Sequence, residues 1–114
     1  MARKDGELLQ GTLGLVIMKA LLHEEMHGYA IARYLEAVTE DVLRIEEGSL
    51  YPALRRLEDR GWVQSRWAIS DTNRRARFYA LTRAGKTQLR AEATTWQAFS
   101  RAITVVLRTE PAVI

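Results

Sequence analysis

The hydrophobic residues recur at helical spacing in three stretches before residue 61. Leu50, Leu54 and Leu57 stand at i, i+4 and i+7, which predicts a helix with one buried stripe. Two earlier apolar patterns predict helices over residues 8–22 and 29–38. The positions expected to point inward there are Leu13, Val16, Ile17, Ala20, Leu21, Ile31, Leu35 and Val38.

The leucine-striped helix has a start signal and a stop signal. Pro52 lacks an amide hydrogen and is best tolerated in a first turn, so the helix is expected to begin near Gly48 or Ser49. Ser49 is expected to cap the free amides at that end. Gly61 is expected to end the helix in a left-handed conformation.

The following stretch has the composition of β-strands. Residues 62–69 and 74–81 are rich in β-branched and aromatic side chains, and the polar residues 70–73 between them predict a loop. These segments predict a β-hairpin with arginines at its tip. Residues 42–45 also alternate and predict a very short strand.

A final helix is predicted over residues 83–107, with Thr82 as its cap. Its apolar residues fall three and four apart and form a seam longer than one small domain can cover. Each large side chain left exposed would forgo about 1.5–3 kcal/mol, so we expect the same helix of a second chain to cover the seam. The expected dimer interface consists of Leu89, Ala93, Trp96, Phe99, Ile103 and Val106.

Three helices followed by a hairpin predict a mostly α fold with a small β-hairpin, the winged helix-turn-helix, plus a long C-terminal dimerisation helix. In such folds the third helix enters the major groove of DNA and the hairpin reaches the flanking backbone. We expect residues 1–82 to form this DNA-binding domain and residues 83–108 to form the dimerisation helix. Residues 109–114 are expected to be a frayed tail.

The distribution of charge agrees with a DNA partner. The formal net charge of the 114 residues is only +3, yet residues 44–83 hold nine arginines against five acidic residues. Residues 1–43 have the opposite balance, with four cations against seven acidic residues. Positive charge gathered on a helix and a hairpin indicates a polyanion, although a solvated basic face is the alternative.

Candidate DNA contacts follow from these positions. Arginine can grip guanine at two atoms, so Arg55 and Arg56 are candidates for base or phosphate contact. Tyr29 and Tyr51 stand at helix starts, where they can pack or can donate to DNA phosphate. The remaining expected contacts are Ser49 at the start of the third helix and the hairpin residues Arg74, Arg75 and Arg77.

The sequence gives little support for catalysis or metal binding. The chain has no cysteine and only two histidines. His23 and His27 formally match the zinc-protease pattern H-E-x-x-H, but that pattern needs a continuous helix and a third ligand. Gly28 follows directly, so a polar helix end is the favoured interpretation. We expect no metal, no cofactor and no enzyme activity.

Targeting signals are not expected either. The first six residues do not lead into a signal peptide, and the longest apolar run, residues 13–22, is too short to span a bilayer. We expect a cytoplasmic protein with no membrane partner.

Four motifs in order resemble the PadR family of bacterial transcriptional regulators. They are HGYAI at 27–31, EGSLYPALRRLE at 47–58, GWV at 61–63 and RARFYALTRAG at 75–85. The resemblance implies a homodimeric winged-helix repressor, usually with an effector that weakens DNA binding. The single C-terminal helix is similar to the smaller branch of the family. Family wings often carry glycine where Asn73 stands, but asparagine also tolerates positive φ.

The resemblance also implies a place for an effector. In some small PadR-like multidrug sensors, the tryptophan at the position of Trp96 pairs with its symmetry mate around flat compounds. Helical spacing adds Ala93 and Phe99 as neighbours. The expected ligand is a planar aromatic or phenolic small molecule, and simple dimer packing is the alternative role of Trp96.

These predictions describe a sequence-specific DNA-binding transcriptional regulator. It is expected to be a homodimeric repressor that binds a palindromic double-stranded operator and is released by a small-molecule effector. The alternative is a winged-helix protein–protein interaction module that does not bind DNA.

Overall fold

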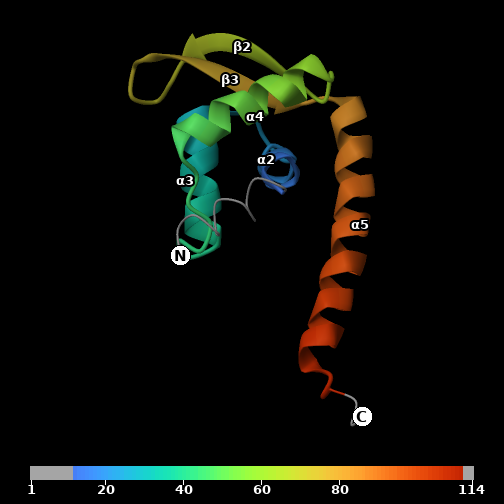
Figure 1. The fold of residues 1–114 in the computed structure, drawn as a ribbon. Coiled ribbons are helices and arrows are strands. Elements are labelled where there is room, and N and C mark those ends of the chain that lie inside the picture. The colour runs from blue at the N-terminus through green and yellow to red at the C-terminus, as the bar shows by residue number, and fades with distance from the viewer. Residues whose placement is uncertain (1–11, 112–114) are drawn as a thin grey trace.

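The computed structural model describes residues 12–111, which contain four helices and three strands (Figure 1). The helices are α2 (Leu13–Ala20), α3 (Gly28–Val38), α4 (Glu47–Asp59) and α5 (Arg83–Arg108). The strands are β1 (Met26–His27), β2 (Val63–Ile69) and β3 (Arg75–Leu81), in the antiparallel order β1-β3-β2. The predicted winged helix-turn-helix with a long C-terminal helix is confirmed.

The core lies between the three shorter helices and one face of the sheet. Leu50, Leu54 and Leu57 are each at most 5% exposed, which confirms the predicted stripe of α4. They belong to one cluster with Ile17 of α2 and Ile31 of α3, which are fully buried. Burial of these apolar side chains holds α4 in place and leaves its other face open to solvent.

The start of α4 differs from the prediction. The helix begins at Glu47, and the cap position is Glu46, so the expected capping role of Ser49 was wrong. The Ser49 amide instead donates to the Glu46 carbonyl at 3.0 Å. Pro52 therefore stands in the second turn, where it removes only the intrahelical hydrogen bond to the Gly48 carbonyl, near the exposed end of the helix.

The end of α4 matches the prediction. Gly61 adopts a left-handed φ of 78°, and its amide donates to the Glu58 carbonyl at 2.9 Å. The Trp62 amide donates to the Leu57 carbonyl at 3.0 Å. This pair of bonds is a Schellman motif, which satisfies the last carbonyls of the helix.

The strand predicted over residues 42–45 was wrong. These residues form a loop, and two of their backbone amides bond to side chains instead of to a neighbouring strand. The Ile45 amide donates to the Glu36 carboxylate at 3.2 Å, and the Leu43 amide donates to the Thr39 hydroxyl at 3.1 Å. Such side-chain acceptors compete with a β-ladder.

The third strand of the sheet is β1, which the sequence did not reveal. Met26 pairs with Tyr79 and His27 pairs with Phe78 on β3. This short strand attaches the start of α3 directly to the hairpin. The position of α3 relative to the hairpin is therefore fixed by backbone hydrogen bonds.

The hairpin of β2 and β3, here called the wing, pairs Val63 with Leu81 at its base and Ile69 with Arg75 near its tip. Asn73 in the connecting loop has φ 61°, so asparagine does adopt the left-handed conformation expected of it. Directly paired residues share a face of the sheet, so Trp67 lies on the same face of the wing as its partner Arg77.

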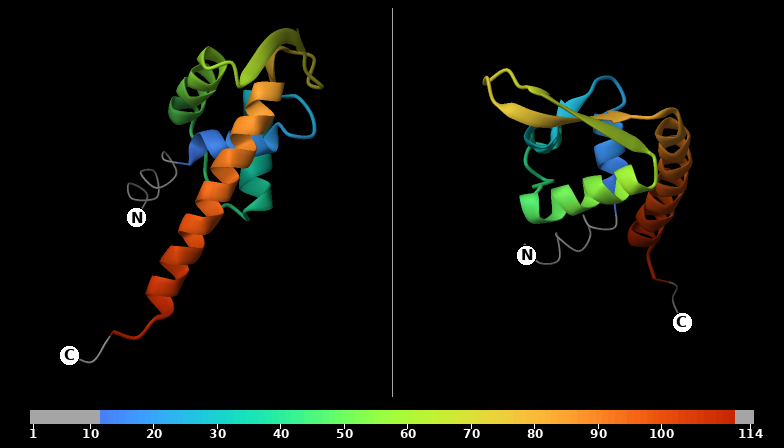
Figure 2. Two further views of the ribbon diagram at one scale, coloured as in Figure 1. Left: turned by 90° about the vertical axis from the view of Figure 1, so that its right-hand side faces the viewer. Right: turned by 90° about the horizontal axis from the view of Figure 1, so that it is seen from above.

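The long helix α5 belongs partly to the core and partly to the surface. The Thr82 hydroxyl accepts a hydrogen bond from the Gly85 amide at 2.9 Å, which confirms the predicted cap. Leu89, expected on the dimer seam, is instead 6% exposed in the core of its own chain, because the first turns of α5 lie against α2. The C-terminal half of α5 extends away from the other elements (Figures 1 and 2).

Some predictions fall partly outside the described residues. The first predicted helix included residues 8–11, which lie outside them, as do residues 112–114 of the predicted tail. Residues 109–111 follow the end of α5 without regular structure. None of the helices in residues 12–111 combines the length and the apolar character needed to cross a membrane.

Candidate nucleic-acid interface

A groove of about 890 Å³ lies between the wing and the starts of α3 and α4. We call it the wing groove. Its only acidic lining residue is Asp71, against the four arginines Arg33, Arg74, Arg75 and Arg77. Its aromatic lining consists of His27, Tyr29, Tyr51 and Trp67. A cationic groove with aromatic walls suits the sugar–phosphate backbone of DNA.

The structure brings most of the predicted contact residues together. Five of them line the wing groove, namely Tyr29, Tyr51, Arg74, Arg75 and Arg77. The other three, Ser49, Arg55 and Arg56, lie exposed on α4 outside the lining of the groove.

The helix phase that the sequence left open is now defined. The buried residues of α4 are Leu50, Ala53, Leu54 and Leu57, and they set its inward direction. At 3.6 residues per turn, Arg55 lies about 30° from the outward direction, whereas Arg56 lies about 70° to one side. Tyr51 lies about 70° to the other side, toward the wing groove. Arg55 is thus the more central cation of this face, and within residues 12–111 neither arginine has an ion-pair partner.

Tyr51 is held between α3 and α4. A Cβ built on Gly28 would lie 2.8 Å from the Tyr51 hydroxyl oxygen, so the ring packs directly on the start of α3. Burial, with the nearby Glu47 carboxylate as a second cause, raises the pKa of the Tyr51 hydroxyl above its usual 10.0. The side chain still has 44% of its surface exposed, so it is a neutral hydrogen-bond donor at the edge of the groove.

The start of α3 forms one wall of the groove. The Nδ1 atom of His27 accepts a hydrogen bond from the Ala30 amide at 3.1 Å and caps the helix. Tyr29 is 64% exposed, and the Arg33 guanidinium carbon lies 6.0 Å from the centre of its ring. Arg33 was not predicted as a contact, although its spacing of four residues from Tyr29 places both on one helix face.

The wing forms the opposite wall. The Arg75 guanidinium carbon lies 4.9 Å from the centre of the Trp67 ring, and Trp67 is 56% exposed. Arg74 is exposed and forms no ion pair with any other part of the described chain. Trp67 was not among the predicted contact residues. Only the strand register, which the sequence did not reveal, places it beside Arg75.

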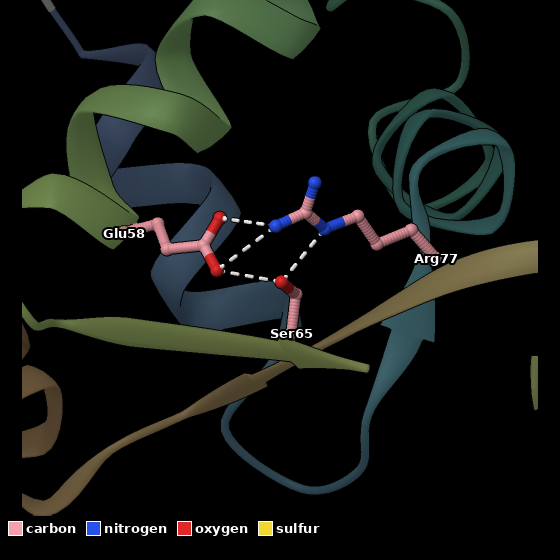
Figure 3. Close-up of polar contacts among 3 residues, drawn as sticks. All are labelled: Glu58, Ser65 and Arg77. Atoms are coloured by element: carbon pink, nitrogen blue, oxygen red, sulfur yellow. Dashed lines mark hydrogen bonds and ion pairs between the residues drawn. The ribbon is translucent and has the colours of Figure 1, made fainter. Parts of the chain in front are cut away.

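Arg77 differs from the other wing arginines because polar groups of its own chain hold its guanidinium (Figure 3). Its Nε donates to the Ser65 hydroxyl at 2.7 Å, and its Nη2 lies 3.3 Å from both carboxylate oxygens of Glu58. The Ser65 hydroxyl donates in turn to the Glu58 carboxylate at 2.6 Å. We call these three residues the Glu58–Ser65–Arg77 cluster.

The H-E-x-x-H match at residues 23–27 does not have the geometry of a zinc protease. Helix α2 ends at Ala20, and His27 lies on β1, so His23 and His27 do not share a helix face. The Nδ1 atom of His27 is already used as the cap of α3. No group of three or more histidine or acidic side chains in residues 12–111 is placed to hold a metal ion.

The predicted effector and dimer residues lie on α5. Trp96, Phe99, Ile103 and Val106 are 43%, 57%, 43% and 69% exposed, and Ala93 is half-buried. The rings of Trp96 and Phe99 lie 6.1 Å apart, centre to centre. Apart from Leu89, the predicted seam is thus an apolar strip on the surface of a single chain.

Comparison with known proteins agrees with this architecture. The model of the "Transcriptional regulator PadR-like family" matches residues 17–91. The "Negative transcriptional regulator PadR" of Bacillus subtilis (strain 168) is 30% identical over 77 residues, which are 68% of this chain and 42% of that protein.

Solved structures extend the similarity over nearly the whole chain. A PadR family transcriptional regulator from Eggerthella lenta DSM 2243 is 28% identical, with a TM-score of 0.79 over 96% of this chain and 93% of that chain. A PadR-like transcriptional regulator from Bacillus cereus strain ATCC 14579 is 25% identical, with a TM-score of 0.78 over 91% of this chain and 99% of that chain. The chain therefore belongs to the PadR-like family of transcriptional regulators.

Proposed function

We propose that this regulator is a homodimeric repressor that binds a palindromic operator and leaves it when a small aromatic molecule binds. The observation that carries the DNA-binding part is Arg55, an exposed arginine near the centre of the open face of α4. The neighbouring wing groove supplies cations for the backbone, while Arg55 is placed to reach base edges. The B. subtilis relative is named a negative regulator, which supports repression as the direction of control.

The apolar strip of α5 supports the dimer. Trp96, Phe99, Ile103 and Val106 share one side of a helix that the rest of the chain leaves uncovered. Burial of each such side chain contributes about 1.5–3 kcal/mol, so pairing with the same strip of a second chain is strongly favoured. A two-fold pair sets two α4 helices about 34 Å apart, which matches successive major grooves on one side of DNA.

The same strip supports an effector site at Trp96. The Trp96 and Phe99 rings together form an exposed aromatic surface, and Ala93 beside them leaves room because its side chain is small. In a two-fold dimer this surface meets its own copy, so two aromatic walls can enclose a planar molecule. A ligand there can change the spacing of the two α4 helices because both are joined to α5 through the wing.

An electrophoretic mobility shift on the DNA upstream of the protein's own gene tests this function. We expect a shift at protein concentrations that leave a random duplex free, and reversal by planar aromatic or phenolic compounds that quench Trp96 fluorescence. Phe99→Asp should give a monomer in analytical ultracentrifugation and weaken the shift. Equal affinity for both duplexes would contradict the proposal. A monomeric wild-type protein that does not bind DNA would favour a protein–protein interaction module instead.

A further inference from the structure

We propose that Arg77 is a positioning residue that fixes the wing at a set angle to α4, and that it does not serve as a DNA phosphate contact. This inference rests on the proposed DNA-binding function. It separates Arg77 from Arg74 and Arg75, which share its segment of sequence and its positive charge.

The Glu58–Ser65–Arg77 cluster joins three different elements through side chains alone. Glu58 belongs to the last turn of α4, Ser65 lies in the middle of β2, and Arg77 lies on β3 (Figure 3). Ser65 donates to Glu58 and accepts from Arg77, so its hydroxyl links the helix to both strands. The guanidinium meets the carboxylate and the hydroxyl with separate nitrogens, a geometry that a fork of donors provides and a single ammonium does not.

The wing needs such a link because its outer part, from the Trp67–Arg77 pair to the tip, is a two-stranded ribbon. β1 pairs with Phe78 and Tyr79 in the middle of β3, and beyond these pairs the wing has only two strands. This outer part runs to Ile69, which is 62% exposed. Two-stranded ribbons twist more variably than larger sheets. A tie between the end of α4 and the middle of the wing removes that freedom before DNA arrives. The angle between the two DNA-binding elements is then set in the free protein.

The charges of the cluster agree with this role. The Glu58 carboxylate offsets the positive charge of Arg77, whereas Arg74 has no acidic partner within the described part of the chain. A DNA phosphate would have to displace both Glu58 and Ser65 from Arg77 in order to use its guanidinium. Arg74 can pair with phosphate without breaking any such bond.

Charge-preserving substitutions test the assignment, with Arg74 as the matched control. Lysine keeps the charge of Arg77 but cannot hold Ser65 and Glu58 with a planar fork. We expect Arg77→Lys to lower operator affinity about tenfold, which corresponds to about 1.4 kcal/mol. Arg74→Lys should lower it clearly less, because a lysine can still pair with phosphate as a point charge. Arg77→Lys with wild-type affinity would overturn the assignment.

Salt dependence gives a second readout on alanine variants. Loss of one phosphate contact lowers the slope of log affinity against log salt by about one. Arg74→Ala should show that decrease, whereas Arg77→Ala should lose affinity with an unchanged slope. A decrease of about one for Arg77→Ala would identify Arg77 as a phosphate contact and contradict the positioning role.

Glu58→Ala gives opposite results under the two roles. It leaves all wing arginines in place and exchanges a half-buried residue near the helix end for a strong helix former. If Arg77 contacts phosphate, removal of the carboxylate frees it and raises affinity for every duplex. If Arg77 positions the wing, operator affinity falls while affinity for random duplex rises or stays constant, so the ratio of the two falls.

Amide hydrogen exchange of the free protein keeps the test independent of DNA. Arg77→Lys and Glu58→Ala should speed exchange in β2 and β3 while the core of α2 and α4 keeps its protection. Unchanged exchange in the wing would overturn the inference even if the operator were never found. A wild-type protein that prefers no duplex would instead overturn the proposed function, so the two failures are distinguishable.

Discussion

The ring of Tyr51 packs directly on the backbone of Gly28, where an added methyl group would come within 2.8 Å of the ring and its hydroxyl. This contact sets how closely α3 and α4 approach each other. Because Tyr51 also lines the wing groove, the packing of the helix pair and the shape of that groove depend on the same glycine. We expect Gly28→Ala to destabilise the fold by about 1–3 kcal/mol in urea unfolding, since the ring or the helix must shift.

A double-mutant cycle isolates that contact. Tyr51→Leu shortens the side chain and removes the atoms nearest to Gly28, so Gly28→Ala should cost clearly less in its presence. The penalties should therefore fail to add, by about 0.5 kcal/mol or more. Additive penalties would show that the cost at residue 28 does not come from the tyrosine.

Gly85 makes a second close approach, at the start of α5. A Cβ there would lie 2.0 Å from the Trp62 carbonyl oxygen. This oxygen belongs to the backbone and cannot easily move away. We expect Gly85→Ala to cost about 1–3 kcal/mol or more, measured as a lower thermal midpoint. Gly48→Ala is the matched control, because no atom lies within 4 Å of its added Cβ. Alanine at residue 48 should be neutral or stabilising by up to about 1 kcal/mol, and equal losses at both sites would contradict the packing account.

Alkaline pH should weaken the fold through two tyrosines. Burial raises the pKa of the Tyr79 hydroxyl above 10.0, with Arg77 acting against that rise, and burial likewise raises the pKa of Tyr51. A raised tyrosine pKa means that the folded state favours the neutral form. The resulting stability is fully present below about pH 10 and is lost as pH rises toward the folded-state values.

Thermal midpoints measured from about pH 8 to about pH 11 test this effect. This range extends from about two units below the ordinary tyrosine pKa to about one unit above it. The wild-type midpoint should fall more steeply above pH 10 than that of a variant carrying Tyr51→Phe and Tyr79→Phe. Parallel declines of the two proteins would assign the alkaline loss to other groups.

Arg55 and Arg56 should differ in their effect on sequence preference. Arg55 lies nearer the outward direction of α4, so Arg55→Ala should lower operator affinity by about 1–3 kcal/mol and relax preference at one base position. Arg56 lies on the flank away from the wing groove, so Arg56→Ala should weaken all duplexes alike. Fluorescence anisotropy with single-base operator variants measures both effects. The reverse pattern would mean that the protein approaches DNA from the Arg56 flank.

The sequence predicted those parts of the fold that depend on near neighbours along the chain. The stripe of Leu50, Leu54 and Leu57 needs only helical periodicity, and the turns at Gly61 and Asn73 need only a residue that tolerates positive φ. The cap at Thr82 likewise depends on a hydroxyl three residues before an amide. These features are encoded within a few residues and were predicted correctly, whereas the cap at the start of α4 was expected at Ser49 and lies at Glu46.

Features that depend on distant partners were not predictable. β1 has only two residues and exists through pairing with β3, so no periodicity signals it. Residues 42–45 alternate as a strand does. The sequence did not reveal that the Ile45 amide bonds to the Glu36 carboxylate, nine residues earlier. Leu89 fits the periodicity of the seam, but the contact of α5 with α2 buries it within its own chain.

The candidate interface shows the same division. The set of basic residues was visible in the sequence, but their individual surroundings were not. Arg77 meets Glu58 from 19 residues away, and Arg75 meets Trp67 only through the strand register. Arginines that look equivalent in the sequence therefore differ in the structure.

Selection of bound duplexes from a random DNA library by the wild-type protein tests sequence-specific binding by a two-fold dimer. We expect a palindromic motif whose two half-sites are centred about 10 base pairs apart, because two α4 helices of a two-fold dimer would enter successive major grooves. We also expect the Arg55→Ala protein to select a less defined motif. Recovery of an unpaired half-site would contradict the dimer, and a library without any enriched sequence would contradict sequence-specific DNA binding itself.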